Sequence, residues 1–257
     1  MYPFINLSFW GQDLILSSYN IMAGIGLILA ILILEYQLSV WSDSAEENNK
    51  IYCVSIAALF IALMSAYFFD ALVHERSFYD GILQFKNQHS IHGFTFYGGF
   101  LGGISCGMVM LKIYRISILK ALNIVTPSII FAHAVGRIGC FLSGCCYGRN
   151  FQIGHFSLKA PTQLMESFFL FLLGLIIIKW IQTKNRFFLY IICYGMFRFL
   201  VDFLRGDDRG TLIVTWLAPS QVVSIGLILA GVTFYLIQNY QNYFSIYSFQ
   251  QGCVKIT

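Results

Sequence analysis

The chain has 257 residues, of which 58% are hydrophobic and only 11% are charged, with a formal net charge of +4. An average soluble domain carries about 25% charged residues, so this composition excludes an ordinary soluble protein. The small net charge gives no reason to expect a nucleic-acid partner. We predict an all-α integral membrane protein with a single polytopic domain over residues 1–257.

Seven long apolar runs account for this composition, and most of them approach the roughly 20 residues that an α-helix needs to cross a bilayer. Because a helix satisfies its own backbone hydrogen bonds in lipid, each run is predicted to be a membrane-spanning helix. Basic residues gather in the loops after the third and fifth runs, so the positive-inside rule places the N-terminus outside and the C-terminus in the cytoplasm. The runs cover approximately residues 14–34, 51–69, 93–111, 121–142, 164–181, 187–204 and 219–237.

Polar residues that are unusual in membrane helices fall near one end of six of the seven runs. When the runs alternate in direction, these ends all lie on the same side of the membrane. Polar residues that served only packing would be expected at random depths. The pattern therefore predicts a polar cavity that is open to one leaflet. In chain order these residues are Tyr19, Asn20, Tyr97, His133, Arg137, Gln163, Glu166, Arg198, Asp202, Arg205, Ser220 and Gln221.

Arg137 stands inside the fourth run, where a charge costs about 2.5–3.5 kcal/mol on insertion scales and is expected to be paired. His133 lies one helical turn before Arg137, and Arg198 and Asp202 have the same i,i+4 spacing. Two guanidinium groups that face one cavity suit a phosphate, which guanidinium binds through two parallel hydrogen bonds. Two structural alternatives stay open: Arg198 and Asp202 would hold helices together, and His133 would be a hydrogen-bonded packing residue.

Cys140, Cys145 and Cys146 follow Arg137 closely. Their C-x4-C-C spacing lacks the C-x2-C pattern of a zinc site, so neither a metal nor another cofactor is predicted. These thiols are interpreted as either structural or part of the site. Gly98 and Gly99 allow a close approach that serves either helix packing or a bound ligand.

These residues, in this order, resemble the bacterial prolipoprotein diacylglyceryl transferase family over nearly the whole chain. The segment from Gly136 through Gly139, Cys140 and Phe141 to Tyr147, Gly148 and Arg149 resembles the family signature Gly-Arg-x-Gly-Asn-Phe, an acidic residue and aromatic-Gly-Arg. Four further segments resemble family motifs. They are Ser18–Met22 (Tyr-Gly-x-Met), Phe96–Gly99 (His-Gly-Gly), Pro161–Glu166 (Pro-Ser-Gln-Leu-x-Glu) and Arg198–Arg205 (Arg-x3-Glu-x2-Arg).

Some positions depart from the family pattern. Tyr97 stands where the family has histidine, Cys140 replaces the asparagine of the signature, and Cys145 replaces its acidic residue. The arginines expected to bind the lipid donor are present, whereas positions associated with the acceptor differ. The sequence therefore resembles a divergent branch of the family.

The resemblance implies an enzyme of the bacterial plasma membrane that moves diacylglyceryl from phosphatidylglycerol to the lipobox cysteine of a preprolipoprotein. Alternatives are a related transferase with another acceptor and a non-enzymatic lipid-binding or transport protein. The implied catalytic residues are Arg137, Arg198, His133 and Tyr97, with His133 as the base. The implied substrate-binding residues are Tyr19, Gly98, Gly99, Gly136, Gly139, Cys140, Tyr147, Gly148, Glu166, Asp202 and Arg205.

Overall fold

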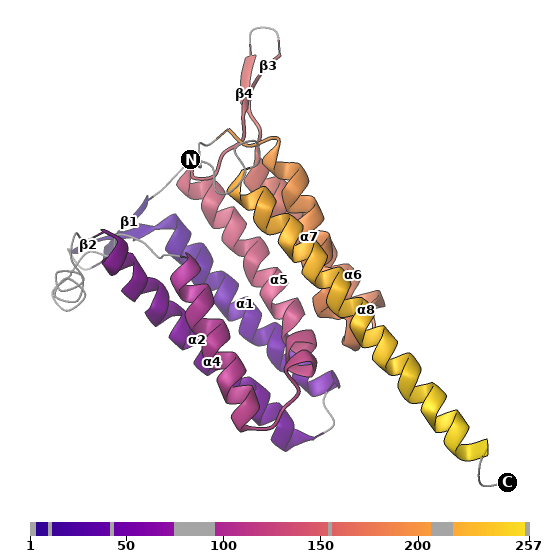
Figure 1. Cartoon of the computed structure of the whole chain (residues 1–257). Coiled ribbons are helices and arrows are strands. Elements are labelled where there is room, and N and C mark those ends of the chain that lie inside the picture. The colour runs from indigo at the N-terminus through magenta and orange to yellow at the C-terminus, as the bar shows by residue number, and fades with distance from the viewer. Residues whose placement is uncertain are drawn as a thin grey trace. The chain divides into compact units, whose positions relative to one another are not determined.

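The computed structural model describes residues 4–9, 12–41, 44–74, 96–153, 156–206 and 218–254. Within these ranges the chain forms seven α-helices (Figure 1). Five of them are long and apolar enough to cross a membrane, judged by length and composition. The prediction of an all-α membrane fold is therefore confirmed. The helices are α1 (Ser18–Trp41), α2 (Ala45–His74), α4 (Phe96–Ile113), α5 (Ile118–Ser143), α6 (Thr162–Trp180), α7 (Arg186–Asp202) and α8 (Pro219–Val254), with a 3₁₀ turn, η1 (Thr183–Asn185), before α7.

The chain divides into two compact parts, and each is described by itself. The smaller part, Leu34–Val125, contains α2 and α4. These helices approach closely at small residues: a Cβ added to Gly103 would lie 2.9 Å from the Cβ of Ala62. An apolar cluster that includes Ile51 and Ile124 fills the core of this part.

The larger part combines Met1–Ile33 with Thr126–Thr257. Here α1 packs on α5, where a Cβ on Gly26 would lie 3.1 Å from the carbonyl oxygen of Ala132. Helix α6 packs on α5 at Gly174, which faces the ring of Phe131. Helix α7 packs along α8 at Gly195, where a Cβ would meet the Ser224 carbonyl at 3.1 Å.

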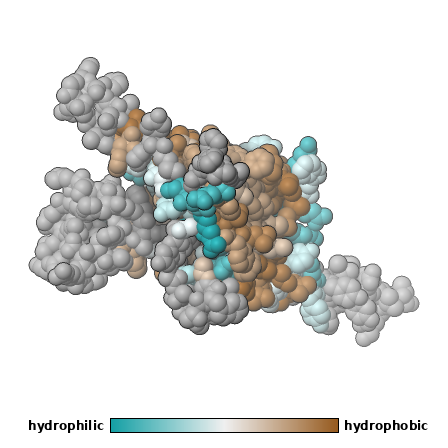
Figure 2. All heavy atoms as spheres, turned by 90° about the horizontal axis from the view of Figure 1, so that it is seen from above, coloured by the Kyte–Doolittle hydropathy of each residue, from teal (hydrophilic) through white to brown (hydrophobic). Residues whose placement is uncertain are grey.

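Helix α6 has one exposed apolar face and one buried face. Phe168, Leu172 and Leu175 recur at helical spacing and are 45–66% exposed. Glu166 and Leu170, on the other face, are almost fully buried. An exposed apolar face is expected where lipid is the solvent. Figure 2 shows such apolar surface over much of the visible side of the molecule.

Two β-hairpins were not predicted, and one of them corrects a boundary. The first helix was expected to begin near residue 14 but begins at Ser18, because β2 (Gln12–Ser17) pairs with β1 (Phe4–Phe9) instead. A short apolar run does not distinguish a strand from a helical turn, so hydropathy misplaced this boundary. The second hairpin joins β3 (Asn150–Ile153) to β4 (Phe156–Lys159), between α5 and α6. The single domain over residues 1–257 stays a prediction.

Candidate functional site

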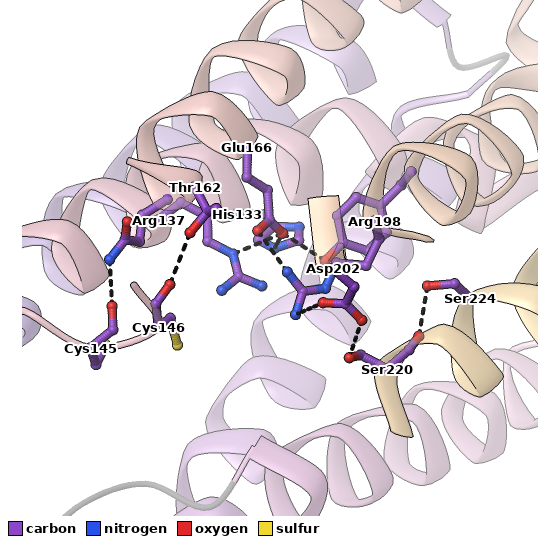
Figure 3. A network of polar contacts seen from close by, with 12 residues as sticks. His133, Arg137, Cys145, Cys146, Thr162, Glu166, Arg198, Asp202, Ser220 and Ser224 are labelled. Atoms are coloured by element: carbon purple, nitrogen blue, oxygen red, sulfur yellow. Dashed lines mark hydrogen bonds and ion pairs between the residues drawn. The ribbon is translucent and has the colours of Figure 1, made fainter. Parts of the chain in front are cut away.

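The carboxylate of Glu166 is the centre of a polar network inside the larger part (Figure 3). Its side chain, on the first turns of α6, is 1% exposed. Oε1 lies 2.9 Å from Nε of Arg137 on α5, and Oε2 lies 3.2 Å from Nη1 of Arg198 on α7. One buried anion therefore pairs with two cations from two other helices. Such pairing is what a charge needs in an apolar environment.

Arg198 is held by carboxylates on two sides. Besides Glu166, its Nη2 lies 3.3 Å from Oδ1 of Asp202, one turn further along α7. The other oxygen of Asp202 accepts a short hydrogen bond from the hydroxyl of Ser220 on α8. The hydroxyl of Ser224 donates in turn to the Ser220 carbonyl at 2.7 Å. This chain of contacts runs from α6 through α7 to α8 and fixes the position of Arg198.

Arg137 is held differently from Arg198. Its ion pair with Glu166 is made through Nε, and Figure 3 shows the two terminal nitrogens directed away from that carboxylate. The Arg137 side chain is 18% exposed, twice the 9% of Arg198. The planar end of Arg137 is therefore better placed than that of Arg198 to meet an anionic ligand.

His133 lies one turn before Arg137 on α5 and joins the same network. Its Nδ1 is 3.2 Å from the Tyr190 hydroxyl, and its Nε2 is 3.7 Å from Glu166 Oε1. The second distance is too long for a hydrogen bond but short enough for charge compensation. With Nδ1 donating to Tyr190, the lone pair of the neutral ring stands on Nε2.

Sequence reasoning missed two tyrosines of this network. The Tyr194 hydroxyl donates to Glu166 Oε1 at 2.9 Å, and its ring packs edge-on against the His133 ring with centroids 4.9 Å apart. Tyr190 stacks on Tyr194. Both tyrosines precede Arg198 and Asp202 at steps of four residues, so a search along one face of α7 finds them.

The loop after α5 is tied to the start of α6. The side-chain amide of Gln163 donates to the Cys145 carbonyl at 2.6 Å, and the hydroxyl of Thr162 donates to the Cys146 carbonyl at 3.0 Å. Because Glu166 follows on the same helix, these bonds fix the loop relative to the ionic network.

Three thiols gather at this loop. The Sγ atoms of Cys140, Cys145 and Cys146 all lie within 4.8 Å of one another. The pKa of the Cys146 thiol is held well below its usual range, because the other two thiols hydrogen-bond to its sulfur and Arg205 and Arg137 lie near. The sequence placed these cysteines close together after Arg137, but their spacing gave no indication that all three sulfur atoms would meet.

The structure also locates the other residues proposed from the sequence. A Cβ on Gly139 would lie 3.3 Å from the Tyr19 ring, so these two residues touch between α5 and α1. A Cβ on Gly136 would meet nothing within 4 Å. Gly98 and Gly99 contact Phe69 and Ala62 of α2 in the smaller part. Tyr97 is the second residue of α4, and its side chain lies outside the described residues.

Tyr147 and Gly148 precede β3 and line an open hollow of about 350 Å³. Gly148 pairs with the buried Arg205 in an isolated β-bridge, and a Cβ on Gly148 would lie 2.6 Å from the Ala160 carbonyl oxygen. The ammonium group of Lys159 lies 4.6 Å from the centre of the Tyr147 ring. This hollow is lined by Tyr147, Gly148, Arg149, Asn150, Lys159 and Gly206.

The fold and this site define a multi-pass membrane protein in which a partly buried arginine, Arg137, and a buried one, Arg198, share one carboxylate. The model of the prolipoprotein diacylglyceryl transferase family matches residues 7–237. The chain belongs to this family, and it is a transferase by that membership.

Named relatives agree with the family match. The chain is 29% identical to the phosphatidylglycerol–prolipoprotein diacylglyceryl transferase of Clostridium tetani, over 87% of this chain and 93% of that protein. It is 31% identical to the phosphatidylglycerol–prolipoprotein diacylglyceryl transferase 2 of Clostridium perfringens, over 85% of this chain and 89% of that protein. It is 30% identical to the enzyme of the same name from Finegoldia magna, over 89% of this chain and 92% of that protein.

Replacing Glu166 tests the network directly. Glu166→Gln removes the shared anion and leaves buried positive charge uncompensated, which costs about 3–5 kcal/mol when one partner of a buried pair is lost. Tyr194→Phe is the matched control, because it keeps the negative charge of Glu166 and removes a hydrogen bond to that carboxylate, worth about 1.5–3 kcal/mol. Thermal unfolding of the two variants in detergent should show the larger fall in midpoint for Glu166→Gln. Equal midpoints for the two variants would show that the charge of Glu166 does not stabilise the fold beyond one hydrogen bond.

Proposed function

We propose that this chain transfers diacylglyceryl from phosphatidylglycerol to a cysteine thiol of a prolipoprotein. In the reaction, the thiolate sulfur attacks the terminal glycerol carbon of the diacylglyceryl group. A carbon–sulfur bond forms, the bond from that carbon to the phosphate oxygen breaks, and glycerol phosphate leaves. The observation that carries the proposal is Arg137, a partly buried guanidinium whose terminal nitrogens point away from its carboxylate partner.

Arg137 is assigned to the phosphate. Charge builds on the phosphate oxygen as the carbon–oxygen bond breaks, and a preorganised cation in an apolar site stabilises that charge strongly. A guanidinium presents two parallel donors, which match phosphate geometry. Arg198 is assigned to positioning, because Glu166 and Asp202 already occupy its two terminal nitrogens. This division refines the sequence-based proposal that both arginines clamp the phosphate.

His133 is proposed as the base. The attacking species is the thiolate, so the acceptor thiol must lose a proton. Nε2 of His133 accepts that proton when Nδ1 donates to Tyr190. The imidazolium that forms lies 3.7 Å from Glu166, whose negative charge stabilises it. Tyr97, Tyr19, Gly136, Cys140 and the other substrate-binding positions inferred from the sequence stay proposals.

The reaction itself is tested by mass spectrometry of a lipobox peptide incubated with phosphatidylglycerol and the purified protein. We expect the mass of one diacylglyceryl group on the cysteine, with release of glycerol phosphate. Glycerol phosphate released while the peptide stays unmodified would assign the chain to another acceptor. If neither product forms, the transferase proposal fails.

Substitution of Arg137 tests the phosphate assignment. Arg137→Ala should lower turnover by about 10²–10³-fold, the loss seen when one transition-state donor is removed. Arg137→Lys should recover little of it, because the planar fork is absent. Turnover per folded protein, judged by an unchanged elution profile, is the measurement. Near wild-type turnover in Arg137→Ala contradicts the assignment.

Substitution of His133 separates the base from donor binding. His133→Gln keeps a polar side chain but provides no basic nitrogen, so turnover should be nearly abolished while phosphatidylglycerol binding persists. Tyr190→Phe, which removes only the partner of Nδ1, should cost about tenfold or less, the scale of one ordinary hydrogen bond. Full activity in His133→Gln would rule out this base.

We also propose that the chain lies in the bacterial plasma membrane with its N-terminus outside. Lys159 and Lys184 precede and follow α6, so they lie on opposite sides of the membrane when α6 spans it. In a background without the native cysteines, Lys159→Cys should react with an impermeant thiol reagent added to intact cells. Lys184→Cys should not react. The reverse pattern would invert the orientation.

A further inference from the structure

We propose that Cys140, Cys145 and Cys146 form a binding site for a soft, thiolate-preferring metal ion such as Zn²⁺. Neither the family assignment nor the proposed reaction calls for such a site. The proposal rests on the geometry of the loop between α5 and the β3–β4 hairpin and does not depend on the transferase function.

The end of α5 brings the first two thiols together. Gly144 has a positive φ of 76°, its N–H donates to the Phe141 carbonyl at 3.2 Å, and the Cys145 N–H donates to the Cys140 carbonyl at 3.2 Å. This pattern is a Schellman motif, which normally places an apolar contact between the two residues that occupy the positions of Cys140 and Cys145. Here that contact joins two cysteines.

The third thiol is turned toward the first two by an unusual backbone conformation. Cys146 has φ 62°, in the left-handed region that non-glycine residues seldom adopt. A conformation of this kind costs about 1–3 kcal/mol and persists only where surrounding contacts impose it. The hydrogen bonds from Gln163 and Thr162 to the carbonyls of Cys145 and Cys146 are those contacts.

The sulfur positions suit a tetrahedral ion. With Zn–S bonds of about 2.3 Å, two sulfurs on one ion lie about 3.8 Å apart. The three Sγ atoms already lie within 4.8 Å of one another, so closure onto an ion needs a shift of about 1 Å or less at each pair. All three cysteines are free thiols. Three thiolates around a divalent cation carry a net charge of about −1, which suits the neighbouring guanidinium groups of Arg137 and Arg205.

Metal content of the full-length protein tests the site. Protein purified in detergent with a non-chelating reductant is loaded with Zn²⁺, freed of excess metal, and analysed by elemental mass spectrometry. Wild type should retain one ion per chain. Cys140→Ser, Cys145→Ser and Cys146→Ser should each lose it. Cys193→Ser is the matched control, because this free thiol lies on α7 away from the loop, and its metal content should stay unchanged.

A second measurement avoids any dependence on the folding of the variants. Wild-type protein with and without Zn²⁺ is treated with an alkylating reagent, and the modified cysteines are located by peptide mass spectrometry. Zn²⁺ should protect Cys140, Cys145 and Cys146 together and leave the reactivity of Cys193 unchanged. The proposal would be overturned if wild-type protein retained no metal, or if Zn²⁺ protected Cys193 equally. It would also be overturned if two of the three cluster cysteines formed a disulfide after isolation without reductant.

Discussion

The rest of the structure depends on how two arginines are kept inside an apolar helix assembly. Burying an unpaired guanidinium would raise the free energy of the folded state, and burying an unpaired carboxylate would raise it similarly. The carboxylate of Glu166 compensates both arginines, because it forms ion pairs with Arg137 of α5 and with Arg198 of α7. The two guanidinium groups in turn compensate its own negative charge. Asp202 then balances the second positive charge. With His133 neutral, the four groups sum to no net charge, and three helices are fixed by one set of ion pairs.

This constraint also separates the roles of the two arginines. Carboxylates occupy the terminal nitrogens of Arg198, so that side chain is a fixed part of the frame. Arg137 makes its ion pair through Nε, and its terminal nitrogens point away from that carboxylate. In the proposed reaction, a phosphate bound beside Arg137 would meet a guanidinium whose position is already set, so no positive charge would have to move. Under the proposed function, this arrangement would stabilise the negative charge that develops as glycerol phosphate leaves.

The helix that carries Glu166 also orders the loop after α5. Gln163 and Thr162 precede Glu166 on α6, and they hold the carbonyls of Cys145 and Cys146. The residue that orders the arginines and the residues that order the cysteine loop thus belong to the first turns of one helix. Arg205 is joined to Gly148, which follows this loop, by an isolated β-bridge.

Much of the fold and part of the site could be predicted from residue patterns. Long apolar runs indicated the helices because length and hydropathy determine what spans a bilayer, and Arg137 was conspicuous because charge is costly there. Pairing is harder to predict: the i,i+4 rule finds partners on one helix, such as Arg198 and Asp202, but gives no information on contacts between helices. The direct contacts of Glu166 with both arginines and with Tyr194 therefore emerged only from packing. The thiol cluster depends on the left-handed backbone at Cys146, which residue spacing does not encode.

The central claim is that Glu166 is the shared counter-ion of both arginines. A double-mutant cycle with Glu166→Gln and Arg137→Met tests it most directly, read as the midpoint of thermal unfolding in detergent. The double variant keeps Arg198 opposite Asp202, so its remaining charges balance. We predict that adding Arg137→Met to Glu166→Gln restores part of the lost stability, with a coupling of about 0.5–3 kcal/mol. Losses that simply add would contradict the account.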